Sequence, residues 1–145
     1  MTEIDAEQYF HQKIPITRAM GVRVVAQDES QFIVEAPVTL NSNHLGTGFG
    51  GSINAVATLA AYGLLWLATR DSAVHVVVAE SSIRFLRPVR ETIRAICLRP
   101  EKEEWTAFET RFAEKGKARI NLRVNVVEAG QTAAALAGTF VVQKT

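Results

Sequence analysis

The segment richest in potential chemistry is a glycine-rich stretch at residues 43–52, which directly precedes the longest apolar run of the chain. It reads Asn43-His44-Leu45-Gly46-Thr47-Gly48-Phe49-Gly50-Gly51-Ser52. A helix starting here leaves the backbone N–H groups of Gly50, Gly51 and Ser52 unpaired, at the positive end of the helix dipole. Such donors stabilise an oxygen that gains negative charge during a reaction, and glycine lets a ligand approach the backbone. The alternative interpretation is that the glycines only form a tight entry into the helix.

Three polar side chains could act on a water or a carbonyl oxygen: Asn43 and His44 within this segment, and Thr58 in the apolar run. Asn43 can orient a water or donate a hydrogen bond, but an amide is no efficient base. His44 titrates near neutral pH and suits general base catalysis, although a histidine in a polar loop is often simply exposed. Thr58 can position a water through its hydroxyl. Alternatively, Thr58 bonds the backbone of its own helix.

The next strand offers a carboxylate and two hydroxyls, at Glu80, Ser81 and Ser82. Because side chains alternate along a strand, Glu80 and Ser82 share one face and Ser81 points the other way. Glu80 is a candidate base and Ser82 a candidate binding residue. An outward, solvated Glu80 is the alternative.

Composition indicates one ordinary globular domain over residues 1–145. Apolar residues make up 48% of the chain and charged residues 21%, which argues against disorder, and the net charge of +1 argues against nucleic-acid binding. The lone Cys97 excludes an intrachain disulfide and leaves zinc ribbons and CxxC redox chemistry without support. His11 and His75 lack metal-ligand spacing, so we expect no metal site.

The N-terminal residues and the apolar run lead us to expect a cytoplasmic protein outside the membrane. The acidic, polar start Met1-Thr2-Glu3-Ile4-Asp5 does not resemble a secretory signal. The apolar run at residues 55–68 is shorter than the roughly 20 residues that span a bilayer. We therefore expect a buried core helix and no membrane partner.

Periodicity predicts a mixed α+β fold. Helices are expected at residues 3–13, 52–69 and 103–115, with a short turn after Pro15 and an N-cap at Gly51 or Ser52. Strands are expected at residues 22–27, 31–38, 74–88, 92–99, 118–126 and 132–143. The helix at 52–69 is apolar on nearly all sides, so an antiparallel sheet must wrap around it. The face of the sheet that does not cover the helix still needs cover, which favours a homodimer or a larger assembly.

Several motifs of this chain resemble those of a known family. Residues 43–53 are similar to the Asn-Gly-(x)-His-Gly-Gly signature of hotdog acyl-CoA thioesterases, and residues 82–89, SIRFLRPV, resemble the strand that follows it. Residues 14–21, 46–52 and 57–60 more closely resemble the YiiD C-terminal thioesterase-like family, whose domain follows an acetyltransferase domain in some bacteria.

This resemblance implies a hotdog fold, an antiparallel sheet wrapped around a long central apolar helix. It also implies a dimer or a dimer of dimers, and an acyl-thioester substrate. Coenzyme A is then part of the substrate and no separate cofactor is expected. The catalytic candidates become Asn43, Gly51, Thr58 and Glu80, with Glu80 acting across a subunit interface. The substrate-binding candidates are His44, Gly50, Ser52, Tyr62, Ser82, Arg87 and Arg90. Tyr62 could line an acyl pocket, or it is simply a core residue. The two arginines, with Arg84 and Arg94, could meet phosphates, or they form a solvated basic face.

The chain departs from the better-known thioesterases at two positions. Their signature histidine is Phe49 here, and their helical carboxylate aligns with Thr58; residues 39–70 contain no Asp or Glu. Two functions follow from this. One is an acyl-CoA or acyl-carrier-protein thioesterase that uses the helix-start donors. The other is an acyl-thioester binding or regulatory module without turnover. A hotdog dehydratase has less support, because the central helix lacks a suitable histidine with a paired acid.

Overall fold

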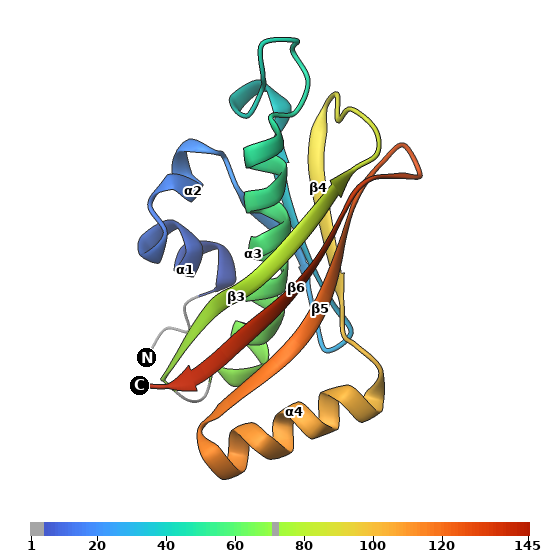
Figure 1. The fold of residues 1–145 in the computed structure, drawn as a ribbon. Helices are drawn as coiled ribbons and strands as arrows, with labels where there is room; N and C mark the ends of the chain where they lie inside the picture. The colour runs from blue at the N-terminus through green and yellow to red at the C-terminus, as the bar shows by residue number, and fades with distance from the viewer. Residues whose placement is uncertain (1–4, 71–72) are drawn as a thin grey trace.

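The computed structural model describes residues 5–70 and 73–145, which form one six-stranded antiparallel sheet around a long helix (Figure 1). The strand order is β1-β2-β4-β5-β6-β3. The strands are β1 (Arg23–Gln27), β2 (Gln31–Pro37), β3 (Val74–Phe85), β4 (Thr92–Leu98), β5 (Lys117–Glu128) and β6 (Gln131–Lys144). The helices are α1 (Ala6–Lys13), α2 (Ile16–Ala19), α3 (Gly50–Thr69) and α4 (Lys102–Lys115), with a 3-10 turn η1 (Val38–Leu40).

Helix α3 is the centre of the fold. Half of its 20 residues are buried, and it contacts every strand of the sheet. By length and composition alone it could cross a membrane, which corrects the expectation that the apolar run is too short. Its burial against the sheet makes it the core helix of the domain. The predicted wrapping of the sheet around this helix is confirmed.

The start of α3 differs from the prediction. The helix begins at Gly50 with Phe49 as its N-cap, and no side chain caps it. The predicted cap at Gly51 or Ser52 is wrong because Phe49 already has an extended backbone and Gly50 is already helical. Gly50, Gly51 and Ser52 are therefore the first three residues of the helix.

The other elements lie close to their predicted bounds. The predicted helix at 3–13 is α1, although Glu3 and Ile4 lie outside the described residues. The strand predicted to end at Pro88 ends at Phe85, because the N–H groups of Leu86 and Arg87 both turn toward the carbonyl of Ala133. Helix α4 ends at Gly116, whose positive φ of 69° suits a glycine C-cap.

A bulge in β3 decides which of its side chains face α3. Val78 pairs with Phe140 and Glu80 pairs with Thr139, so Ala79 is the extra residue. Before the bulge, Val74, Val76 and Val78 pack against the core, and after it Ile83 does so. Ser81 consequently lies on the same side as α3. Glu80 and Ser82 lie on the opposite side of the sheet, which we call the outer face.

Candidate active site

The first turn of α3 presents free backbone donors. The first hydrogen bond of the helix runs from the N–H of Ile53 to the carbonyl of Phe49, at 2.9 Å. In the described part of the chain, the N–H groups of Gly50, Gly51 and Ser52 have no acceptor. A Cβ on Gly51 would lie 2.6 Å from the Phe49 ring, so this position needs glycine while that ring stays in place. These amides provide the positive end of the helix dipole that the sequence predicts.

An apolar groove of about 430 Å³ runs along α3 from this turn. Gly51, Asn54, Thr58 and Tyr62 follow one another on the lining face of the helix, at spacings of three, four and four residues. The rest of the lining comes from the segment around α2, from α3 itself and from β3: Ile14, Ile16, Thr17, Met20, Ala55, Leu59, Val78 and Ser81. The structure thus brings Gly51, Thr58 and Tyr62 together as neighbours of one cavity.

The polar groups inside the groove are few. The hydroxyl of Thr58 donates to the backbone carbonyl of Asn54 at 2.9 Å, and the Asn54 side-chain oxygen lies 3.5 Å away. The lone pairs of the Thr58 hydroxyl therefore stay available to accept a hydrogen bond. Asn54 was missed by the sequence analysis. Its spacing between Gly51 and Thr58 was the signal that could have found it.

Asn43 holds the loop before α3 together. Its side-chain oxygen accepts from the N–H groups of Leu45 and Thr47, at 2.8 and 3.2 Å, and its amide donates to the Thr47 hydroxyl at 3.0 Å. This is the Asx-type bonding that fixes turns. The structure therefore places Asn43 within the loop and apart from the groove lining. His44 is exposed on the same loop.

The loop between β3 and β4 lies against the start of α3. The N–H of Gly48 donates to the carbonyl of Val89 at 2.7 Å, which ties the two loops together. Arg87 and Arg90 are exposed on this loop. The loop lies at the same end of the molecule as the start of α3 (Figure 1). Arg94, near the start of β4, forms an ion pair with Glu35, which also pairs with Arg23 at 3.2 Å.

Glu80 and Ser82 do not face the groove of their own chain. Both lie on the outer face of β3, with the sheet between them and α3, while Ser81 lines the groove. No lining residue of the groove is an Asp, Glu or His. Within residues 5–70 and 73–145, no group of three or more His, Cys, Asp or Glu side chains is arranged to hold a metal ion.

Comparison with known proteins agrees with this architecture. Residues 4–144 match the model of a family described as "Putative thioesterase (yiiD_Cterm)". A protein of unknown function from Chlorobaculum tepidum TLS is 32% identical, with a TM-score of 0.89 over 97% of this chain and 93% of that one. A structure named "putative thioesterase" from Shewanella oneidensis is 26% identical, with a TM-score of 0.85 over 95% and 94%. One from Pseudomonas aeruginosa, named "Probable Thioesterase", shares the fold at 24% identity, with a TM-score of 0.81 over 97% and 94%.

Proposed function

The chain belongs to the YiiD C-terminal thioesterase family and has the hotdog fold, and from this premise we propose that it hydrolyses an acyl thioester at the start of α3. The observation that carries the proposal is the junction of two features. The unpaired N–H groups of Gly50, Gly51 and Ser52 meet the apolar groove at Gly51. A carbonyl placed at this junction has hydrogen-bond donors beside its oxygen and an apolar channel for its acyl chain.

The reaction needs a stabilised oxygen and an oriented water. Water adds to the thioester carbon, and the carbonyl oxygen becomes negative. The carbon–sulfur bond then breaks, a proton of the attacking water passes to the sulfur, and a carboxylic acid and a free thiol leave. The N–H of Gly51 points at the developing charge, supported by that of Gly50. One such donor contributes about 10²–10³ in kcat in well-studied enzymes.

We assign the water to Thr58 and Asn54. The Thr58 hydroxyl already donates to a backbone carbonyl, so it accepts a hydrogen bond from the water. The Asn54 amide, which lines the same stretch of groove, donates to the water or to the thioester oxygen. Neither group is a strong base, so a faster reaction needs one from elsewhere. Glu80 of a second copy is the candidate that the sequence offers, and it can act only on a groove that packs against the outer face, because Glu80 faces that side of β3.

The thiol carrier is proposed to leave the groove past the loops at the start of α3. Arg87 and Arg90 are exposed there and suit the phosphates of a cytoplasmic coenzyme A or of an acyl carrier protein. They differ from Arg94, whose charge is already paired with Glu35. His44 and Ser52 flank the same opening as candidate binding residues.

A second candidate function is an acyl-thioester binding module without turnover. The observation that favours it is the absence of Asp, Glu and His from the groove lining. The groove and the helix-start donors serve binding as well as catalysis.

Release of free thiol from a panel of acyl-CoAs tests the proposal. We expect Gly51→Val to lower kcat about 100-fold or more, because the added side chain blocks the Gly51 N–H donor. We expect Thr58→Ala to lower kcat up to about 100-fold, because the attacking water loses the hydroxyl that orients it. Thr69→Ala is the matched control. Thr69 lies on the same helix and makes the same type of bond, donating to the carbonyl of Leu65 at 2.7 Å, but does not line the groove.

Two outcomes would contradict the thioesterase proposal. If acyl-CoA thioether analogues bind but no thioester is cleaved across the panel, with acyl carrier protein thioesters included, the binding module is the function. If Gly51→Val and Thr58→Ala match Thr69→Ala in rate while wild-type protein is active, the chemistry lies outside this groove.

A further inference from the structure

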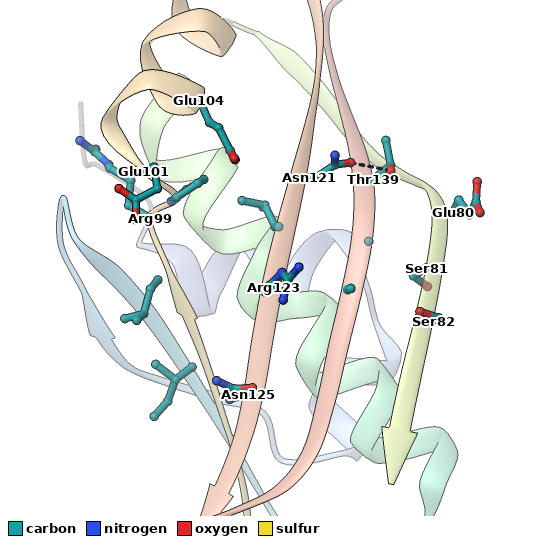
Figure 2. A pocket seen from close by; sticks show the side chains of 16 residues that line it. Glu80, Ser81, Ser82, Arg99, Glu101, Glu104, Asn121, Arg123, Asn125 and Thr139 are labelled. Carbon is teal, nitrogen blue, oxygen red and sulfur yellow. Dashed lines mark hydrogen bonds between the residues drawn. The ribbon is translucent and has the colours of Figure 1, made fainter.

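The groove along α3 suits a hydrocarbon chain, whereas a larger hollow of the molecule does not. That hollow, of about 800 Å³, lies on the outer face of the sheet and is lined in part by Arg123, Glu101 and Glu104 (Figure 2). Charged groups lose hydration when an apolar chain covers them, so the hollow disfavours a hydrocarbon. The groove begins at Gly51 and is lined mostly by apolar side chains. An acyl chain whose carbonyl lies at Gly51 is therefore expected to follow the groove.

The lining of the groove changes from polar to apolar along α3. Asn54 and Thr58 lie within about two turns of Gly51. Past Thr58, helix α3 contributes Leu59 and Tyr62 to the lining. This order matches a thioester, which has a polar head and a hydrocarbon tail.

An exposed apolar side chain at the groove has the same meaning. Ile16, which lines the groove from α2, is 64% exposed. Covering such a side chain with a hydrocarbon removes apolar surface from water, which favours binding of an acyl chain here.

Tyr62 stands at the far end of the groove. It is the last residue of α3 in the lining, and Trp66, one turn later, lies outside it. The Tyr62 ring packs edge-on against the fully buried Phe140, with centroids 5.9 Å apart and an angle of 85° between the rings. The Trp66 ring is stacked on Tyr9 of α1 at 4.9 Å. Because both rings have aromatic partners, they form a fixed wall across the end of the groove.

The distance from Gly51 to this wall limits the length of the chain. Tyr62 follows Gly51 by eleven residues, or about 16 Å along an α-helix. Long helical side chains lean back over the preceding turn, so the ring leaves about 11 Å open. A fully extended chain advances about 1.2 Å per bond, because three backbone bonds span about 3.5 Å. The open stretch therefore holds about nine bonds, which is a chain of about ten carbons.

We propose that Tyr62 determines the chain length accepted by the groove, and that the substrate carries a medium-chain acyl group of about eight to twelve carbons. The length rests on the proposed function, which places the carbonyl at Gly51. A shorter chain leaves apolar lining uncovered, and each CH₂ group that is not buried weakens binding roughly fourfold. A longer chain meets the Tyr62 ring and has to turn out of the groove into water.

The test is kcat/KM for a series of substrates from butanoyl-CoA to hexadecanoyl-CoA. For the wild type we expect the maximum near decanoyl-CoA, with values at least about 10-fold lower at both ends of the series. Tyr62→Ala opens the groove as far as Trp66, about 6 Å farther, so the maximum should move about four or five carbons longer. Tyr62→Phe keeps the ring and is the matched control, for which we expect the wild-type chain length.

A second variant changes the length in the opposite direction. Leu59 lines the groove three residues before Tyr62, and Leu59→Phe places a ring about 4.5 Å nearer to Gly51. We expect its maximum near hexanoyl-CoA. This variant leaves Tyr62 in place, so it tests the length even if Tyr62→Ala does not fold, which far-ultraviolet circular dichroism checks.

Binding of acyl-CoA thioethers, which cannot be hydrolysed, separates the chain length from the reaction. If their dissociation constants are lowest near ten carbons and shift with Tyr62→Ala while no thioester is cleaved, the length is supported and hydrolysis is contradicted. The length is overturned if the wild type prefers butanoyl chains or treats all chains alike. It is also overturned if Tyr62→Ala and Tyr62→Phe share one maximum, even when the protein cleaves thioesters.

Discussion

Cys97 is the one thiol of the chain, and its setting makes it inert. Its side chain is fully buried on β4, and burial raises the pKa of the thiol to about 12. The reactive form of cysteine is the thiolate, which at pH 8 is then roughly one molecule in ten thousand. We expect no reaction of the native protein with a disulfide reagent such as DTNB within minutes, and one thiol per chain after denaturation in guanidinium. Rapid labelling of native protein would contradict this burial.

The same property serves the thiol-release assay, because the protein adds no background signal of its own. A variant that loosens the core makes the Cys97 thiol reactive, so this check comes before any change in its rate is interpreted.

Individual residues show which features of the candidate site the sequence alone could predict. The glycine pattern predicted the free amides of Gly50 and Gly51, since that inference needs only the start of a helix. The environments of Thr58 and Asn43 were not decidable, because each side chain had a local and a long-range partner available. In the structure both use local partners: Thr58 bonds the backbone one turn earlier, and Asn43 bonds its own loop. Asn54 was missed because an amide on an apolar helix belongs to no catalytic motif, and its spacing from Gly51 and Thr58 was its only signal.

At the scale of elements, Glu128 fastens the loop between β3 and β4 to the end of β5. Its carboxylate accepts from the N–H groups of Arg90, Glu91 and Thr92, at 2.8, 2.9 and 3.2 Å. Burial alone raises the pKa of Glu128, but these three bonds and the charge of Arg90 outweigh it, so the pKa lies below its usual range. Because the pKa is lower in the folded state, this carboxylate stabilises the protein above its unfolded-state pKa, near 4.3. The stabilisation is lost as pH falls through the folded-state pKa.

Glu128→Gln should therefore destabilise the protein in a pH-dependent manner. We expect a loss of about 1 kcal/mol in the free energy of unfolding at pH 7, a value that allows for the exposure of this group. The loss should shrink toward pH 3, where the wild-type carboxylate is itself becoming protonated. Urea unfolding at both pH values measures it, with the exposed Glu109→Gln on α4 as the control. An equal loss at both pH values would show that charge plays no part.

Hydrophobic periodicity predicted the helices and strands well, but it predicted less well which side chains of a strand face the core. Alternating apolar residues in β5 and the all-round apolar character of α3 each point to one structure, so both elements were identified. The bulge at Ala79 leaves no such signal, because the residues on either side remain compatible with a regular strand. It nevertheless decides that Ser81 faces α3 while Glu80 and Ser82 face outward. The outward direction of Glu80 on β3 therefore argues against a catalytic role within its own chain, although the chemistry of its carboxylate would suit one.

At the scale of the whole molecule, the two edges of the sheet are unequal. β1 is short, with 5 residues, whereas β3 has 12 residues and, among residues 5–70 and 73–145, pairs only with β6. Val77 and Phe85 on β3 are about half exposed. A long unprotected edge with apolar side chains is a template for another strand. The homodimer expected from the sequence is therefore predicted to form by antiparallel pairing of β3 with β3 of a second copy.

Antiparallel pairing of β3 with β3 relates the two copies by a two-fold axis and closes the assembly at two chains. Val77→Lys places a charge on the β3 edge, and we expect it to halve the mass measured by sedimentation velocity. Val25→Lys on the β1 edge, where Val25 is 41% exposed, is the matched control and should keep the wild-type mass. A Val77→Lys variant that keeps the wild-type mass would contradict the pairing of β3 with β3.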